Sequence, residues 1–235
     1  MMRLAATLSL AGLACAPAWA APVTLHNFKY GYEAIDTTMT GYVGVGGFVG
    51  EFNGGAANSF VTFCTDLFQS FSWNVTYTNY ELVANGAVNG FSFNQAAMLG
   101  KLFTVAGPVD NHDSSVAFQL AVWEITHDSA PGSIHSGNFA VEAGGTATQL
   151  ALAEAWLATA GSASAANDYV VTRLYSPTNQ DFIIAGRRSG GGTGGQISEP
   201  AGLVLASLAF VGLAWTRRRA TVAGSAAAHS PASKV

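Results

Sequence analysis

Two short apolar runs, one near each end of the chain, limit which part of this sequence can fold as a globular domain. The first run, Leu4 to Pro17, follows a basic start at Arg3 and precedes Ala18-Trp19-Ala20. A basic start, an apolar centre and an A-x-A site predict a secretory signal peptide at residues 1–20, cleaved before Ala21. The chain is therefore predicted to be exported.

The second apolar run, Ala201 to Trp215, follows a glycine-rich stretch at residues 189–197 that predicts a flexible linker. A helix rises about 1.5 Å per residue, so this run measures roughly 22 Å, close to the thickness of a bilayer core. Arg217, Arg218 and Arg219 follow it, and such a cluster stays on the cytoplasmic side. This predicts a C-terminal transmembrane helix with the preceding domain outside the membrane.

The segment Ser198–Arg219 resembles the PEP-CTERM sorting signal, through Glu199-Pro200, the apolar run and the arginine cluster. It departs from that signal at Ser198, where the family has its first proline, and in the polar tail of residues 220–235. The resemblance implies an exosortase, a membrane-embedded enzyme of exopolysaccharide-producing Gram-negative bacteria, as a partner. It also implies tethering at the inner membrane and then a place at the cell surface or in the biofilm matrix.

Residues 21–188 remain as one extracytoplasmic domain with no internal repeat. They carry five Lys or Arg and thirteen Asp or Glu residues, a net formal charge of −8. A nucleic-acid partner is disfavoured, because phosphates need a basic face. Aromatic residues make up 11% and charged residues 10% of the chain, which excludes an intrinsically disordered protein.

The pattern of residues in this domain predicts an α+β fold: a β-rich sandwich or barrel with about three inserted helices. Short alternating stretches joined by glycine turns predict strands, and apolar residues at helical spacing predict helices. The predicted strands lie within 23–63 and at 71–83, 169–175 and 181–185. The predicted helices span 94–104, 116–126, capped by Ser114 or Ser115, and 146–159.

The mature domain keeps a single cysteine, Cys64, because Cys15 leaves with the signal peptide. No intramolecular disulfide is then available. A lone cysteine in an exported domain is buried as a small hydrophobe, pairs with another chain, or is used chemically.

Two segments suggest the chemical use of Cys64. Phe63-Cys64-Thr65-Asp66 and Gln119-Leu120-Ala121-Val122-Trp123 together resemble the thioester domains of bacterial surface adhesins. The resemblance covers about residues 60–128. It implies that the Cys64 thiol attacks the Gln119 carboxamide, expels ammonia and forms an internal thioester, which an amine or hydroxyl of a partner then opens.

This reading predicts a covalent adhesin that reacts once, with no turnover and no cofactor. Asp66, Trp123 and Glu124 are candidate supporting residues, with Trp123 expected mainly as a core anchor. Asp66, Glu124, His112 and His127 are candidates for moving protons, and sequence proximity does not rank them.

Three other interpretations stay open. The first is a matrix protein with no chemistry, in which Trp73, Tyr77 and Tyr80 stack on exopolysaccharide. The second is a hydrolase pairing Cys64 with His112 or His127, although no nucleophile elbow or metalloprotease motif is present. The third is a metal site; its spacing fits no usual ligand pattern, so we predict no metal. Its candidate ligands are His112, Asp113, His127, Asp128 and His135.

Overall fold

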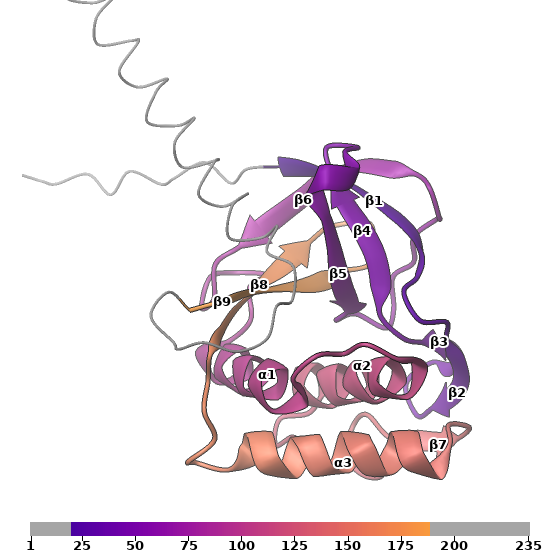
Figure 1. Cartoon of the computed structure of the whole chain (residues 1–235), viewed down its shortest axis with the longest axis vertical. Helices are drawn as coiled ribbons and strands as arrows, with labels where there is room; N and C mark the ends of the chain where they lie inside the picture. The colour runs from indigo at the N-terminus through magenta and orange to yellow at the C-terminus, as the bar shows by residue number, and fades with distance from the viewer. Residues whose placement is uncertain (1–19, 189–235) are drawn as a thin grey trace, which may run out of the picture.

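Short stretches rich in Val, Phe, Tyr and Thr form nine strands in residues 20–188, the part of the chain that this computed structural model describes. Six of them close into a barrel in which every neighbouring pair is antiparallel (Figure 1). Closure leaves no unpaired edge in the barrel sheet. In barrel order the strands are β1 (Ala20–Phe28), β4 (Phe48–Phe52), β5 (Ser59–Cys64), β9 (Phe182–Arg187), β8 (Tyr169–Tyr175) and β6 (Thr76–Val83).

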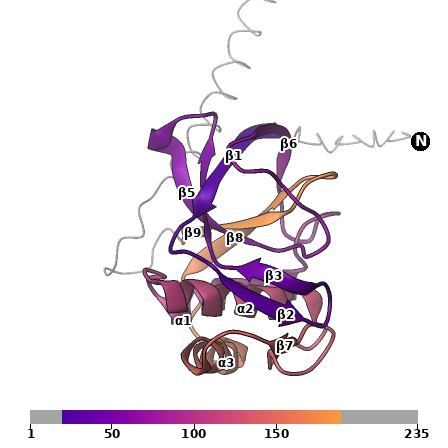
Figure 2. The ribbon, with the colours of Figure 1, turned by 90° about the vertical axis from the view of Figure 1, so that its right-hand side faces the viewer.

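A second, three-stranded sheet lies beside the helices (Figure 2). β2 (Glu33–Thr37) is its centre, flanked by β3 (Gly41–Val45) and β7 (Val141–Ala143). Gly41 begins β3 at a φ of 75°, a left-handed conformation that favours glycine at the turn between β2 and β3. β7 is absent from the predicted elements, because a strand of three half-exposed or exposed residues carries no readable alternation.

Three α-helices pack below the barrel: α1 (Phe93–Ala106), α2 (His112–His127) and α3 (Ala147–Gly161). α1 and α2 lie between the barrel and α3 (Figure 1). Each helix begins with a capping box, in which the residue before the helix and the third helical residue bond each other's main-chain N–H groups. Every residue of α2 from Ser114 to Ile125 is buried, so this helix is the centre of the core.

The predicted α+β class with three helices is confirmed, and two of the finer predictions are wrong. The second helix begins at His112 because Asn111 caps it and accepts from Ser114 N at 3.0 Å. Ser115, the other predicted cap, instead accepts from Gly47 N at 2.8 Å. The strand predicted over 71–83 covers only Thr76–Val83, so Trp73 lies outside it.

No helix in residues 20–188 is both long and apolar enough to cross a bilayer. The transmembrane helix predicted over Ala201 to Trp215 lies outside the described residues, as do most of the predicted signal peptide and the linker. β1 begins at Ala20, the residue before the predicted cleavage site, where it pairs with Glu81 of β6.

Candidate functional site

Cys64 is the last residue of β5, at the point where β5 meets the beginning of β9. The register places Cys64 opposite Phe182, and Thr65 N donates to Asp181 O at 2.9 Å. Antiparallel pairing therefore brings residues 180–182 next to a cysteine more than a hundred positions earlier in the chain. The Cys64 side chain is 0% exposed.

The Cys64 sulfur meets the carboxamide of Gln180, a glutamine that the sequence analysis did not single out. Gln180 Nε2 donates both to Cys64 Sγ and, at 2.9 Å, to the main-chain oxygen of Asp66. The same oxygen accepts the thiol proton, with Sγ 2.6 Å from Asp66 O. The sulfur and the Gln180 amide are thus held together by one shared acceptor.

Gln119, the predicted acyl donor, also contacts Cys64, but through the main chain. Its Oε1 accepts from Cys64 N at 2.9 Å, and its Nε2 donates to Cys64 O at 2.8 Å. Gln119 is 0% exposed on α2, so both bonds are buried. Its amide fastens the end of β5 to the central helix, with both of its polar atoms satisfied.

The pKa of the Cys64 thiol is raised to about 12, chiefly by burial and to a smaller extent by the nearby Asp66 carboxylate. Trp123, the Asp66 main chain and Gln180 lower the pKa but do not outweigh burial. The free thiol is therefore protonated at neutral pH. Any attack by this sulfur needs its proton to move as the new bond forms.

The Trp123 side chain on α2 lies close to the Cys64 sulfur. Its indole is buried against Phe139, with ring centroids 5.9 Å apart, as expected of a core anchor. Within residues 20–188 its Nε1 has no hydrogen-bond partner of ordinary geometry, although the indole is near enough to Cys64 to lower the thiol pKa. A buried N–H donor thus stays available beside the sulfur.

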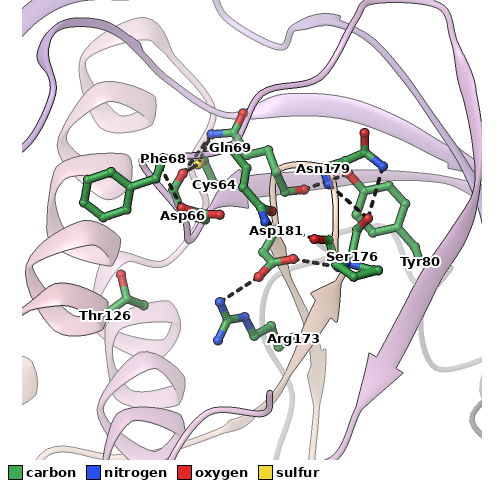
Figure 3. Close-up of polar contacts among 12 residues, drawn as sticks. Cys64, Asp66, Phe68, Gln69, Tyr80, Thr126, Arg173, Ser176, Asn179 and Asp181 are labelled. Carbon is green, nitrogen blue, oxygen red and sulfur yellow. Dashed lines mark hydrogen bonds and ion pairs between the residues drawn. The ribbon is translucent and has the colours of Figure 1, made fainter. Parts of the chain in front are cut away.

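A partly buried ion pair fixes the turn that carries Gln180. Arg173 Nη2 lies 2.6 Å from Asp181 Oδ2, and Asp181 Oδ1 accepts from Ser176 N at 2.7 Å (Figure 3). Burial raises the pKa of Asp181, while Ser176 and Arg173 lower it. Ser176 Oγ also accepts from Asn179 Nδ2 at 3.1 Å. These bonds hold residues 176–181 in one conformation and so position Gln180.

A cavity of about 320 Å³ is lined by residues that follow Cys64 and Gln180 in the chain, but not by Cys64 or Gln180 themselves. Its wall includes the two residues after Cys64 and the residue after Gln180. Asp66 belongs to this wall, and its Oδ1 accepts from Phe68 N at 2.7 Å. Gln69, in the amide orientation that its neighbours require, donates to Asp66 Oδ2 at 3.1 Å. The lining residues are Thr65, Asp66, Phe68, Gln69, Phe91, Gln95, Thr126, His127, Arg173, Tyr175 and Asp181.

Glu124, a predicted supporting residue, does not line this cavity. Its Oε1 accepts from Gly132 N at 2.8 Å and Ser133 N at 3.1 Å. Burial raises its pKa to about 7, although these two bonds lower it. Glu124 holds the loop after α2, and that role belongs to the scaffold rather than to the sulfur site.

The structure separates the candidate histidines. His127 lines the cavity, and burial lowers its pKa. His112 lies elsewhere, 3.9 Å from Glu33 and 3.7 Å from Asp113. A hydrolase pairing of Cys64 with His112 therefore has no support in this geometry. Within residues 20–188, no three His, Cys, Asp or Glu side chains are grouped so as to hold a metal ion.

The chain was compared with protein families, curated proteins and solved structures. No family model matches the chain, and neither a curated protein nor a solved structure matches it. The sorting-signal residues Glu199, Pro200, Arg217, Arg218 and Arg219 lie outside the described residues.

Proposed function

We propose that this protein is an exported, envelope-anchored surface protein whose Cys64 forms an internal thioester with Gln180. The observation that carries the proposal is the direct contact between Gln180 Nε2 and the Cys64 sulfur. Gln180 replaces Gln119 as the acyl donor, because both polar atoms of the Gln119 amide are already bonded to the Cys64 main chain.

The bond would form by acyl transfer within the folded domain. The Cys64 sulfur attacks the amide carbon of Gln180, the C–N bond breaks, and the thiol proton leaves with the nitrogen as ammonia. The turn at residues 176–181 holds the two groups in contact, which replaces a costly encounter by a pre-organised one. The indole N–H of Trp123, which lowers the pKa of the Cys64 thiol, supports this step by favouring the sulfur as it loses its proton.

Burial of Cys64 suits the product of this reaction. A thioester carries no charge, so a site that disfavours a free thiolate does not disfavour the thioester. Enclosure of the sulfur at the end of β5 also protects the acyl group from water until a nucleophile enters the cavity. The domain then reacts once, as a covalent binder at the cell surface or in the matrix, and is not a turnover enzyme.

A second candidate is a structural matrix protein in which Cys64 is a buried, inert thiol. The raised thiol pKa and the hydrogen bond to Asp66 O favour it. Its predicted aromatic platform is reduced, because Tyr80 is buried in the core and its hydroxyl donates to Gln180 O at 2.7 Å. Trp73 remains exposed.

Methylamine uptake separates the two candidates. Purified full-length protein is incubated with methylamine, digested and mapped by mass. We expect the label on the Gln180 side chain as a methylamide, together with a newly alkylatable Cys64. Absence of the label and a fully alkylatable Cys64 before treatment would leave the structural candidate. A label on Gln119 would return the acyl donor to the residue predicted from sequence.

A further inference from the structure

Three Asn-Gly pairs occur in the chain, at Asn53-Gly54, Asn85-Gly86 and Asn89-Gly90. Asparagine followed by glycine can cyclise, because the main-chain nitrogen of the glycine reaches the side-chain carbonyl carbon of the asparagine and no Cβ stands in its way. The dipeptide is the same in all three pairs, so the fold decides which of them reacts fastest in the native protein.

Asn53-Gly54 forms the turn that follows β4. Asn53 has a φ of 57° and Gly54 a φ of 65°, and Gly55 N donates to Phe52 O across the turn. Positive φ at both central residues defines a type I′ turn, which Asn-Gly favours. Asn53 N donates to Pro22 O at 2.9 Å and anchors the start of the turn. The bond that closes the turn is long, at 3.4 Å, so it only weakly opposes the rotation that brings the two reacting groups together.

The attacking nitrogen of this pair is free. Within residues 20–188, Gly54 N donates no hydrogen bond, and a Cβ at this glycine would meet nothing within 4 Å. Asn53 and Gly54 are both exposed, and in the same part of the chain the Asn53 carboxamide has no hydrogen-bond partner. Solvent therefore reaches both the nitrogen that attacks and the carbon that is attacked.

The second pair is held on both of its reacting groups. Asn85 Nδ2 donates to Val171 O at 2.9 Å, and Gly86 N donates to Phe91 O at 2.7 Å. The Phe93 ring also lies against Gly86 and leaves it no open space. These contacts have to break before the nitrogen can reach the asparagine side chain.

The third pair is a close internal control for the first. Asn89 is exposed like Asn53 and shares its left-handed backbone, with a φ of 65°. Its glycine differs, because Gly90 N donates to Ala87 O at 3.0 Å and the Ala84 carbonyl oxygen lies against Gly90. The hydrogen bond and the crowding at the attacking nitrogen thus distinguish the two pairs, and exposure and φ do not.

We propose that Asn53 is a self-modification site, at which the folded protein converts asparagine into aspartate and isoaspartate. The Gly54 nitrogen attacks Asn53 Cγ, the Cγ–Nδ2 bond breaks, and the proton of the attacking nitrogen leaves with the amide group as ammonia. Water then opens the cyclic succinimide at either of its carbonyls, which gives an aspartate or an isoaspartate. The reaction needs no second protein, and the inference is independent of the thioester.

The conversion changes one end of the barrel. It adds a carboxylate two residues after Glu51, in a domain whose net formal charge is already −8. An isoaspartate also lengthens the main chain of a turn that lies on the path from β4 to β5, the strand that ends at Cys64. Aged protein therefore differs from new protein in charge and in main-chain length at this turn.

The test compares the three pairs within one sample of the full-length protein. Folded protein is incubated at about pH 8, digested with chymotrypsin and mapped by mass, since each conversion adds about 1 Da. We expect conversion at Asn53 to be at least about tenfold faster than at Asn85 or Asn89, where a hydrogen bond on the glycine nitrogen has to break first. The rate at Asn53 should rise with pH, because a deprotonated amide nitrogen is the better nucleophile.

An incubation in guanidinium chloride removes the fold and supplies the control. The three pairs should then convert within about threefold of one another, because no fixed hydrogen bond distinguishes them in the unfolded chain. Asn53→Gln should abolish conversion at this position, since the longer side chain disfavours the five-membered ring. Asn89→Gln, at an equally exposed asparagine, is the matched control and should leave the rate at Asn53 unchanged.

Each outcome decides the proposal. Equal rates at the three pairs in the folded protein would overturn the assignment to Asn53. A tenfold preference for Asn53 that persists in guanidinium chloride would show that the sequence and not the turn sets the rate. Chymotrypsin cuts after aromatic residues and so separates Asn53 from Cys64, which keeps this loss of ammonia distinct from the one that a thioester requires.

Discussion

Two glutamines reach Cys64 from opposite sides, and their surroundings give them different roles. On the α2 side, Gln119 is fully buried and both of its amide atoms bond the cysteine main chain. On the β9 side, Gln180 is half-buried at the end of a turn, and its amide reaches the sulfur. The same kind of side chain thus holds β5 to a buried helix at Gln119, and at Gln180 it is the acyl donor that we propose, at the start of a strand.

This comparison also separates stability from chemistry. α2 contributes hydrogen bonds that hold the scaffold, through Gln119 to β5 and through Glu124 to the following loop. The turn before β9 positions Gln180, and the Arg173–Asp181 ion pair holds this turn in place. Substitutions on the two sides should therefore affect different measurements.

Replacing Gln180 should have the largest effect, on reactivity alone. Gln180→Ala removes the acyl donor, so we expect methylamine uptake to fall to background, at least about 100-fold. The folded state should change little, because Gln180 is half-buried and its amide bonds only the Cys64 site. Mass spectrometry and thermal melting measure the two effects. Uptake that persists in this variant would remove Gln180 from the proposal.

Replacing Gln119 should lower stability and leave thioester formation intact, the opposite of the effect expected for Gln180. Gln119→Ala leaves the Cys64 N–H and C=O buried without partners and opens a cavity, at a cost of about 3 kcal/mol in the free energy of unfolding. Urea unfolding measures it. Under conditions where the variant is folded, the loss of ammonia should still occur. If stability is unchanged and the thioester is lost, Gln119 is the acyl donor after all.

The structural role of Glu124 on α2 can be tested through the pH dependence of stability. Its folded-state pKa is about 7 against an ordinary value of 4.5. Because the folded state holds this proton more tightly, Glu124 lowers stability as pH rises between these values. Glu124→Gln should then be up to about 3 kcal/mol more stable than wild type at pH 8, and similar to it at pH 4. Melting temperatures at both pH values test this; a variant that is less stable at pH 8 would contradict it.

A third glutamine at the same cavity should matter least. Gln69 donates to Asp66 and Asn179 but does not contact the sulfur. Gln69→Ala should change the free energy of unfolding by no more than about 0.5 kcal/mol and leave methylamine uptake within about twofold. A loss as large as that expected for Gln180→Ala would show that any amide near the cavity affects the reaction.

The sequence carried enough information for the fold class but only for half of the site that we propose. Helical periodicity located α1 and α3 within two residues at each end, and the Gln119 motif correctly pointed to a glutamine beside Cys64. Gln180 was not predicted, because no local sequence motif distinguishes it from the other polar residues that precede the apolar run at 182–185. Its importance arises from the pairing of β5 with β9, a long-range register that neither alternation nor spacing reveals.

The same limit explains why the cavity was not predicted, because Thr65 and Arg173 come together in its wall only where the ends of β5, β8 and β9 meet. Helix capping was partly readable. Ser or Asn before an apolar run predicts a helix start, but Asn111 and Ser114 both satisfy that rule and only the capping geometry selects Asn111.

The intact mass of the untreated full-length protein, followed by non-reducing peptide mapping, tests the central claim most directly. A Cys64–Gln180 thioester predicts a mass about 17 Da below the calculated value, from the loss of ammonia. It also predicts one linked pair of peptides, one containing Cys64 and the other Gln180. The calculated mass with a free, alkylatable Cys64 would contradict the thioester, and a link between Cys64 and Gln119 would contradict its assignment to Gln180.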